Sequence, residues 1–109
     1  MYIPDKGDIV SIDFDPSAGK EIMKRRPAYV ISQKIFNEHT GFAVVSPITS
    51  SVRNMQLEVV LPSNLSTQGA ILVHQMKSLD FENREISFIE KAPESVIKKM
   101  TALSKAIIS

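Results

Sequence analysis

Hydrophobic and polar positions alternate along several short stretches of the chain, a pattern typical of β-strands with one buried face. In the first stretch, residues 8–14, Ile12 and Phe14 fall on one face and Ser11 and Asp13 on the other. Five further stretches of similar length and composition lie at residues 27–33, 42–49, 57–61, 70–75 and 85–89. Short strands at this spacing, joined by turn residues, predict a small antiparallel β-barrel or sandwich.

The period becomes helical near the end of the chain. Apolar residues recur there at intervals typical of one helix face: Val96, Ile97, Met100, Leu103 and Ile107. Pro93 and Glu94 are good signals for a helix start. Residues 37–41 are instead predicted to form a turn. The pattern therefore predicts one mainly β domain over residues 1–109, with a C-terminal amphipathic helix that covers the barrel.

The connection between the first two predicted strands, residues 15–25, is longer than the two to five residues usual in a hairpin. We interpret it as a candidate functional loop. It runs into three consecutive cations, Lys24, Arg25 and Arg26, directly before Pro27. We predict that Lys24 and Arg25 belong to a mobile loop, whereas Pro27 restricts Arg26 to extended conformations and ties it to the second strand.

The overall composition is that of a globular protein, with 43% hydrophobic and 23% charged residues. The apolar runs all fall short of the roughly 18 to 20 residues that a membrane helix needs. The N-terminal residues also lack the basic and then apolar plan of a signal peptide. We therefore expect a cytoplasmic protein that does not bind a membrane.

Several kinds of site are excluded by residue counts. The absence of cysteine excludes disulfides, zinc–thiolate centres and thiol nucleophiles. His39 and His74 are too few for a multi-histidine metal centre, and there is no glycine-rich phosphate loop or nucleophile elbow. We therefore expect neither a metal nor a cofactor. Because the net charge is only +1, any nucleic-acid site must come from a local cluster of cations.

RNA cleavage is one reaction that the remaining residue types allow. RNA carries its own nucleophile, the 2′-hydroxyl, so an enzyme can act by aligning that oxygen with phosphorus and stabilising the charge that develops. An arginine fork binds phosphate oxygens, a threonine hydroxyl adds a hydrogen bond, and a carboxylate can orient the guanidinium or accept a proton. Arg26, Thr49 and Glu21 have these chemical types and lie at predicted strand ends or in the adjoining loop.

Five short motifs follow one another along nearly the whole chain: Gly7-Asp8, Asp15-Pro16…Gly19-x-Glu21, Arg26-Pro27, Pro47-x-Thr49 and Gln75-x-Lys77. Each motif is weak by itself. Their order and spacing together resemble the MazF/PemK family of toxin–antitoxin ribonucleases. The resemblance implies a homodimer of SH3-like barrels, each with a C-terminal helix. It also implies metal-independent cleavage of single-stranded RNA at short sequences, which leaves 2′,3′-cyclic phosphate and 5′-hydroxyl ends.

The resemblance further implies which residues take part. Arg26 corresponds to the principal catalytic residue, with Thr49 and Glu21 beside it. RNA contacts are implied from the loops after the first and third strands and from the glutamine-x-lysine segment, where this chain has Lys24, Arg25, Arg53, Gln75 and Lys77. The implied protein partner is a cognate antitoxin whose flexible, acidic C-terminal segment competes for the same cations.

Two other functions remain open at this point. A non-enzymatic toxin on the same fold, like the CcdB toxins that poison DNA gyrase, would need no arginine and threonine at the strand ends, so Arg26 and Thr49 favour the enzyme. Simple nucleic-acid binding by a small barrel would call for stacking aromatics on its surface. Phe14, Phe42 and Phe88 are instead predicted to face the core.

Overall fold

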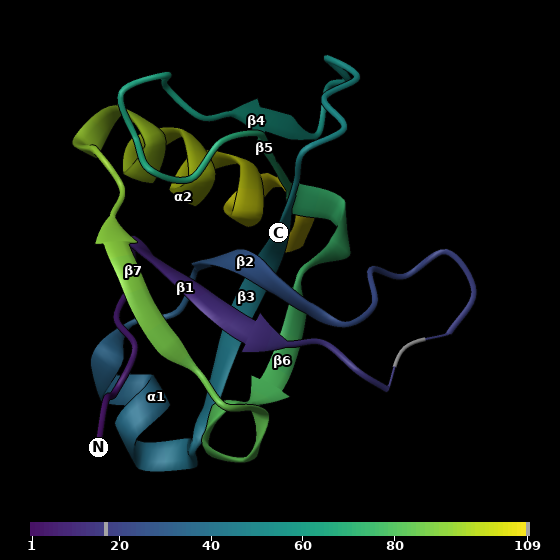
Figure 1. Ribbon diagram of the computed structural model, residues 1–109. Coiled ribbons are helices and arrows are strands. Elements are labelled where there is room, and N and C mark those ends of the chain that lie inside the picture. The colour runs from purple at the N-terminus through teal and green to yellow at the C-terminus, as the bar shows by residue number, and fades with distance from the viewer. Residues whose placement is uncertain (17, 109) are drawn as a thin grey trace.

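The computed structural model describes residues 1–16 and 18–108. Within these residues the sheet has seven strands (Figure 1): β1 (Asp8–Asp13), β2 (Arg25–Val30), β3 (Phe42–Thr49), β4 (Glu58–Val60), β5 (Ala70–Leu72), β6 (Lys77–Asp80) and β7 (Ser87–Lys91). The helical elements are α1 (Lys34–Thr40), α2 (Glu94–Ile108) and two single 3-10 turns, η1 (Val73–Gln75) and η2 (Phe81–Arg84). Neither α-helix is long and apolar enough to cross a bilayer.

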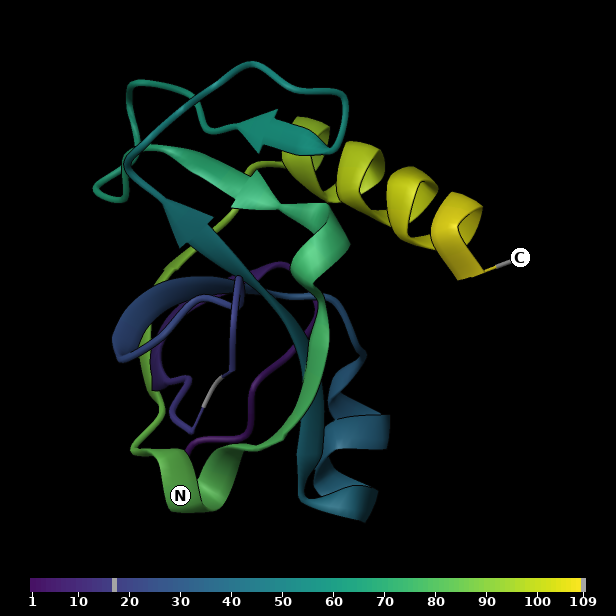
Figure 2. The same ribbon diagram turned by 90° about the vertical axis from the view of Figure 1, so that its right-hand side faces the viewer.

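The strands form one antiparallel sheet in the order β4-β5-β3-β2-β1-β7, with β6 also paired to β3. Figure 2 shows the sheet curving around a barrel-like interior, with α2 lying across one end. The ladder does not close, because no pair within the described residues joins β7 to β4 or β6. The prediction of a mainly β fold with a C-terminal helix is confirmed.

Strand β2 is covered on both faces. Tyr29 packs with Ile9 of β1 in a core cluster that also includes Met100 of α2. Ala28 and Val30 belong to a second cluster in the barrel interior. Since successive side chains of a strand point to opposite faces, this double burial fixes the direction of every residue in β2.

Helix α2 covers the first of these clusters. Val96 and Met100 are buried, and Ile97 and Leu103 pack against the cluster while remaining partly exposed. The predicted apolar stripe is therefore confirmed up to Leu103. Ile107, at the end of the stripe, is exposed.

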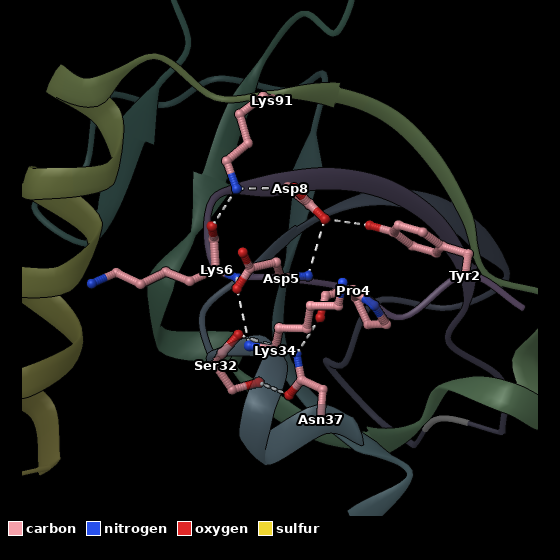
Figure 3. Close-up of polar contacts among 9 residues, drawn as sticks. All are labelled: Tyr2, Pro4, Asp5, Lys6, Asp8, Ser32, Lys34, Asn37 and Lys91. Carbon is pink, nitrogen blue, oxygen red and sulfur yellow. Dashed lines mark hydrogen bonds and ion pairs between the residues drawn. The ribbon is translucent and has the colours of Figure 1, made fainter. Parts of the chain in front are cut away.

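Residues 34–40 form helix α1, so the prediction of a turn at 37–41 is wrong. The helix ends at Gly41, which adopts a left-handed conformation with φ of 74°. Its buried residue is Asn37, whose Nδ2 donates to the carbonyl oxygens of Pro4 (2.8 Å) and Ser32 (3.2 Å). The Ser32 hydroxyl donates in return to Asn37 Oδ1 at 2.6 Å (Figure 3). This network ties α1 to the N-terminal segment.

The N-terminal segment is also tied to the sheet. Asp8 accepts hydrogen bonds from the Tyr2 hydroxyl and the backbone N–H of Asp5, and its Oδ1 lies 3.1 Å from Lys91 Nζ (Figure 3). Asp5 in turn accepts from the backbone N–H of Lys34 at the start of α1. One chain of polar contacts therefore links β1, β7 and α1 at the edge opposite the loop between β1 and β2 (Figure 1).

The later strands begin or end at residues other than those predicted. The stretch predicted as a strand over 70–75 is β5 followed by η1, and the strand predicted over 85–89 lies at β7. Strand β6 was not predicted. Phe14 is buried as expected, but Phe42 and Phe88 are 45% and 50% exposed, so the prediction that both face the core is wrong. Phe88 instead contacts the ring of Tyr2 at the surface.

Replacing Asn37 with alanine should lower the free energy of unfolding by about 2–3 kcal/mol, because the buried carbonyl of Pro4 and hydroxyl of Ser32 lose their partner. Urea unfolding followed by circular dichroism measures the change. Glu38→Ala, at the exposed neighbouring position of the same helix, should stay within about 0.5 kcal/mol of wild type. Equal effects of the two substitutions would contradict a stabilising role for the Asn37 network.

Candidate functional site

The pairing register brings the predicted arginine and threonine together. In the β2–β3 ladder, Ala28 lies opposite Pro47 and Val30 opposite Val45. These pairs end at Ala28 and Pro47, and Arg26 and Thr49 each lie two residues beyond that last pair. Both residues therefore lie at the same end of two adjacent strands, where the loops of the site begin.

Arg26 is half-buried on the same strand face as Ala28 and Val30. Its Nε donates to the carbonyl of Met23 at 3.2 Å. Within the part of the chain that the structure describes, its Nη1 and Nη2 groups form no hydrogen bond or ion pair. The fork of the guanidinium therefore remains available for a bidentate anion.

Thr49 is half-buried at the end of β3, opposite Ala70 of β5. Its Oγ1 accepts a hydrogen bond from the backbone N–H of Ser51 at 3.1 Å. Because this contact uses the hydroxyl as an acceptor, the hydroxyl proton can be donated to a ligand. The contact also fixes the direction in which the chain leaves the strand.

Arg25 lies in β2 on the face opposite to Arg26, so the prediction that it belongs to a mobile loop is wrong. Its Nη2 donates to the carbonyl of Glu85 and lies 3.4 Å from both the Ser11 carbonyl oxygen and Ser87 Oγ. Its Nη1 is 3.8 Å from a carboxylate oxygen of Glu85. Arg25 therefore bridges β2 to β7 and the turn before it. Its predicted contact with RNA remains untested.

The loop between β1 and β2 is fastened at its base. The backbone N–H of Lys24 donates to Asp15 Oδ1, and the Lys24 carbonyl accepts from the N–H of Phe14, both at 2.9 Å. Arg84 of η2 donates from Nη1 to the carbonyls of Asp13 (3.1 Å) and Asp15 (2.8 Å). Lys24 is exposed and belongs to the loop, as predicted. Arg84 was not predicted, because no motif distinguishes it from a surface arginine.

The middle of the loop is fastened to η1 and β6. Gln75 Oε1 accepts from the backbone N–H of Ile22 at 3.0 Å. Glu21 Oε1 accepts from the backbone N–H of Ala18 at 2.9 Å and lies 3.2 Å from Lys77 Nζ. Gln75 and Lys77, both predicted to bind RNA, therefore contact the loop that carries Glu21.

These contacts keep Glu21 ionised. The hydrogen bond from the Ala18 backbone, followed by the hydrogen bond and charge of Lys77, holds the pKa of the Glu21 carboxyl below its usual range. The carboxylate is therefore charged throughout the neutral range. It becomes protonated only as the pH falls through this lowered pKa.

A groove of about 410 Å³ opens between this loop, the residues after β3, and η1. Its lining residues are Lys20, Ile22, Thr49, Ser51, Arg53, Met55, Glu58, Leu72, His74 and Gln75. Three predicted site residues, Thr49, Arg53 and Gln75, therefore line one surface. Glu21 lies between two lining residues in sequence, and Arg26 lies at the same end of β2 and β3 as Thr49. Lys20, Glu58 and His74 were not among the predicted site residues.

The site combines an arginine fork, a hydroxyl and an ionised carboxylate beside a groove with cationic side chains. Such a set can bind a phosphodiester and stabilise negative charge that develops on its oxygens. Within residues 1–16 and 18–108, no group of three or more His, Cys, Asp or Glu side chains is arranged to hold a metal ion.

The curved antiparallel sheet, the helix across its end and the cationic groove at the strand ends define a class of small β-barrel toxins. Residues 5–108 match the family described as the PemK-like, MazF-like toxin of type II toxin-antitoxin systems. The chain belongs to this family, and the resemblance drawn from the sequence is confirmed.

Two relatives of this chain are proteins of Escherichia coli K12. The chain is 39% identical over 83 residues to the endoribonuclease toxin MazF, covering 76% of this chain and 74% of that protein. It is 31% identical to the endoribonuclease toxin ChpB over 109 aligned residues, covering 95% of this chain and 93% of the relative.

Solved structures extend the likeness to the whole fold. MazF from Deinococcus radiodurans superimposes with a TM-score of 0.94 at 33% identity, covering 99% of this chain and 98% of the other. A MazE–MazF complex from the same organism gives a TM-score of 0.87 at 29% identity, covering 100% and 98%.

Gly69 allows the backbone before β5 to lie close to the carbonyl oxygen of Thr49. Replacing Gly69 tests this close approach. A Cβ at position 69 would lie 2.1 Å from the Thr49 carbonyl oxygen, and the φ of +121° is strained for any other residue. Gly69→Ala should therefore lower the free energy of unfolding by about 3 kcal/mol or more. Gly41→Ala, where φ is also positive but a Cβ meets open space, should cost only about 1–2 kcal/mol. Thermal unfolding of both variants measures these losses of stability. Equal losses would refute the close approach.

Proposed function

We propose that this protein is a metal-independent endoribonuclease that cleaves single-stranded RNA at short sequences. The observation that carries the proposal is that Arg26 and Thr49 lie at the same end of the paired strands β2 and β3, where Thr49 lines the groove. Family membership and relatives that are named endoribonucleases support the same reaction. The ends of β2 and β3 carry groups that can align the RNA 2′-hydroxyl with phosphorus and stabilise the charge that develops during cleavage.

In the proposed reaction the 2′-oxygen attacks the adjacent phosphorus and the bond from phosphorus to the 5′-oxygen breaks. The departing 5′-oxygen takes up a proton from Arg26 or from water, so the products are a 2′,3′-cyclic phosphate and a 5′-hydroxyl. Arg26 stabilises the charge on the phosphate oxygens, since a guanidinium keeps its proton at physiological pH and is a poor base. Thr49 donates a further hydrogen bond, and Glu21, which is ionised, supports the removal of the 2′-hydroxyl proton.

The groove supplies the proposed RNA contacts. Arg53 and Gln75 line it, and Lys24 is exposed on the adjoining loop. We assign these three residues to RNA binding. The contacts of Arg25 with β7 and of Lys77 with Glu21 make both less suited to this role.

The proposed partners follow from the family. We propose a homodimer that acts on mRNA in the cytoplasm and is neutralised by a cognate antitoxin. MazF of Deinococcus radiodurans, a structural relative, has been solved together with MazE. An acidic antitoxin segment would compete with RNA for the cations of the groove.

The proposal is tested by incubating purified protein with a long single-stranded RNA in excess EDTA. Wild type should make discrete cuts with cyclic-phosphate ends. Arg26→Ala should lower the cleavage rate by roughly 10²- to 10³-fold, as expected for the loss of one preorganised group that stabilises the transition state. Arg26→Lys should recover only part of the rate because it keeps the charge without the fork.

Lys99→Ala serves as the control, since Lys99 is an exposed cation of α2 away from the groove. Its rate should equal that of wild type. Intact RNA from well-folded wild type would refute the enzyme and favour a non-enzymatic, CcdB-like toxin. Cutting that requires a metal would refute the mechanism.

A further inference from the structure

Lys77 is placed to act on the loop between β1 and β2. It lies in β6, opposite Val45 of β3, and it contacts the middle of the loop at Glu21. Its Nζ is 3.2 Å from Glu21 Oε1, and its side chain is only 26% exposed, against 48% for Glu21. A lysine that binds the RNA backbone would instead need its ammonium open to an approaching phosphate.

The contact with Lys77 complements two others in the same loop. The Ala18 backbone donates to the same carboxylate oxygen, and Ile22 donates its backbone N–H to Gln75. The Gln75 contact fixes the loop backbone, and the Ala18 contact fixes Glu21 only relative to its own loop. Within the described residues, Lys77 is the contact that joins the carboxylate itself to the sheet.

We propose that Lys77 is a positioning residue that promotes RNA cleavage by holding the Glu21 carboxylate, and that it is not a phosphate contact. This inference rests on the proposed function, in which Glu21 takes part in proton removal. The ammonium restrains the carboxylate beside the groove, so less ordering is needed when RNA binds.

The first test needs no RNA. In Lys77→Met, the amide hydrogen of Ala18 should exchange roughly two- to five-fold faster, the range expected for an exposed ion pair. The pKa of Glu21, followed by NMR, should rise toward its ordinary value but stop short of it, because the Ala18 hydrogen bond remains. Lys99→Met, which removes an exposed lysine of α2, should change neither quantity. Unchanged exchange and an unchanged Glu21 pKa in Lys77→Met would overturn the proposal.

The second test measures kcat/KM for RNA cleavage. If Lys77 acts through Glu21, the double variant Lys77→Met/Glu21→Gln should be no slower than Glu21→Gln alone. The acidic limb of the pH profile should move to higher pH in Lys77→Met, because a carboxylate with a raised pKa is protonated sooner as the pH falls. Additive losses in the double variant would overturn the proposal.

Salt dependence separates positioning from phosphate binding. A lost contact with single-stranded RNA lowers the slope of log affinity against log salt by about 0.7. The slope for Lys77→Met should equal that of wild type, and a fall of this size would overturn the proposal. If wild type leaves RNA intact, the proposed function fails and the role of Lys77 in cleavage fails with it. The amide exchange of Ala18 would still show whether Lys77 restrains Glu21.

Discussion

The burial of both faces of β2 is the constraint on which the site depends. One face packs under α2 through Tyr29, and the other fills the barrel interior through Ala28 and Val30. A slip of one residue would move every side chain of the strand to the opposite face, so both cores resist it. Arg25 and Arg26, adjacent and chemically identical, are thereby given different surroundings. Arg25 is fixed against β7, whereas Arg26 lies at the strand end that also carries Thr49.

The loop that carries Glu21 depends on a different kind of interaction. Ile22 is the loop residue that packs against the barrel cluster, and polar contacts from three other elements hold the rest: Arg84 of η2, Gln75 of η1 and Lys77 of β6. Each such contact contributes less than a buried apolar side chain does. The site therefore combines groups on rigid strand ends with a carboxylate whose position depends on several weaker contacts. Loops on a rigid scaffold commonly carry function in this way.

The sequence predicts those parts of the fold in which local pattern and tertiary packing agree. Strands β1, β2 and β3 and helix α2 alternate or repeat as their burial requires. Helix α1 was missed because the polar residues 37–41 favour a turn locally, whereas Asn37 is stabilised by Pro4, 33 residues away. Strand β6 is short and mostly polar, and it forms because β3 supplies its backbone partners. Neither contact leaves a pattern in the neighbouring sequence.

The site is subject to the same limit, because contacts between distant parts of the chain bring its residues together. These contacts also make its cations differ. Residue type and motif order singled out Arg26, Thr49 and Glu21. Only the pairing of β2 with β3 brings Arg26 and Thr49 to the same end of the sheet, and Lys77 contacts Glu21 across 56 positions. Arg25 and Lys77 each have a carboxylate partner, which reduces their attraction for RNA. Among the described residues, four other cations at the groove or its loop form no ion pair: Lys20, Lys24, Arg26 and Arg53. A net charge of +1 therefore conceals a local excess of positive charge at the strand ends, where a phosphate backbone would bind.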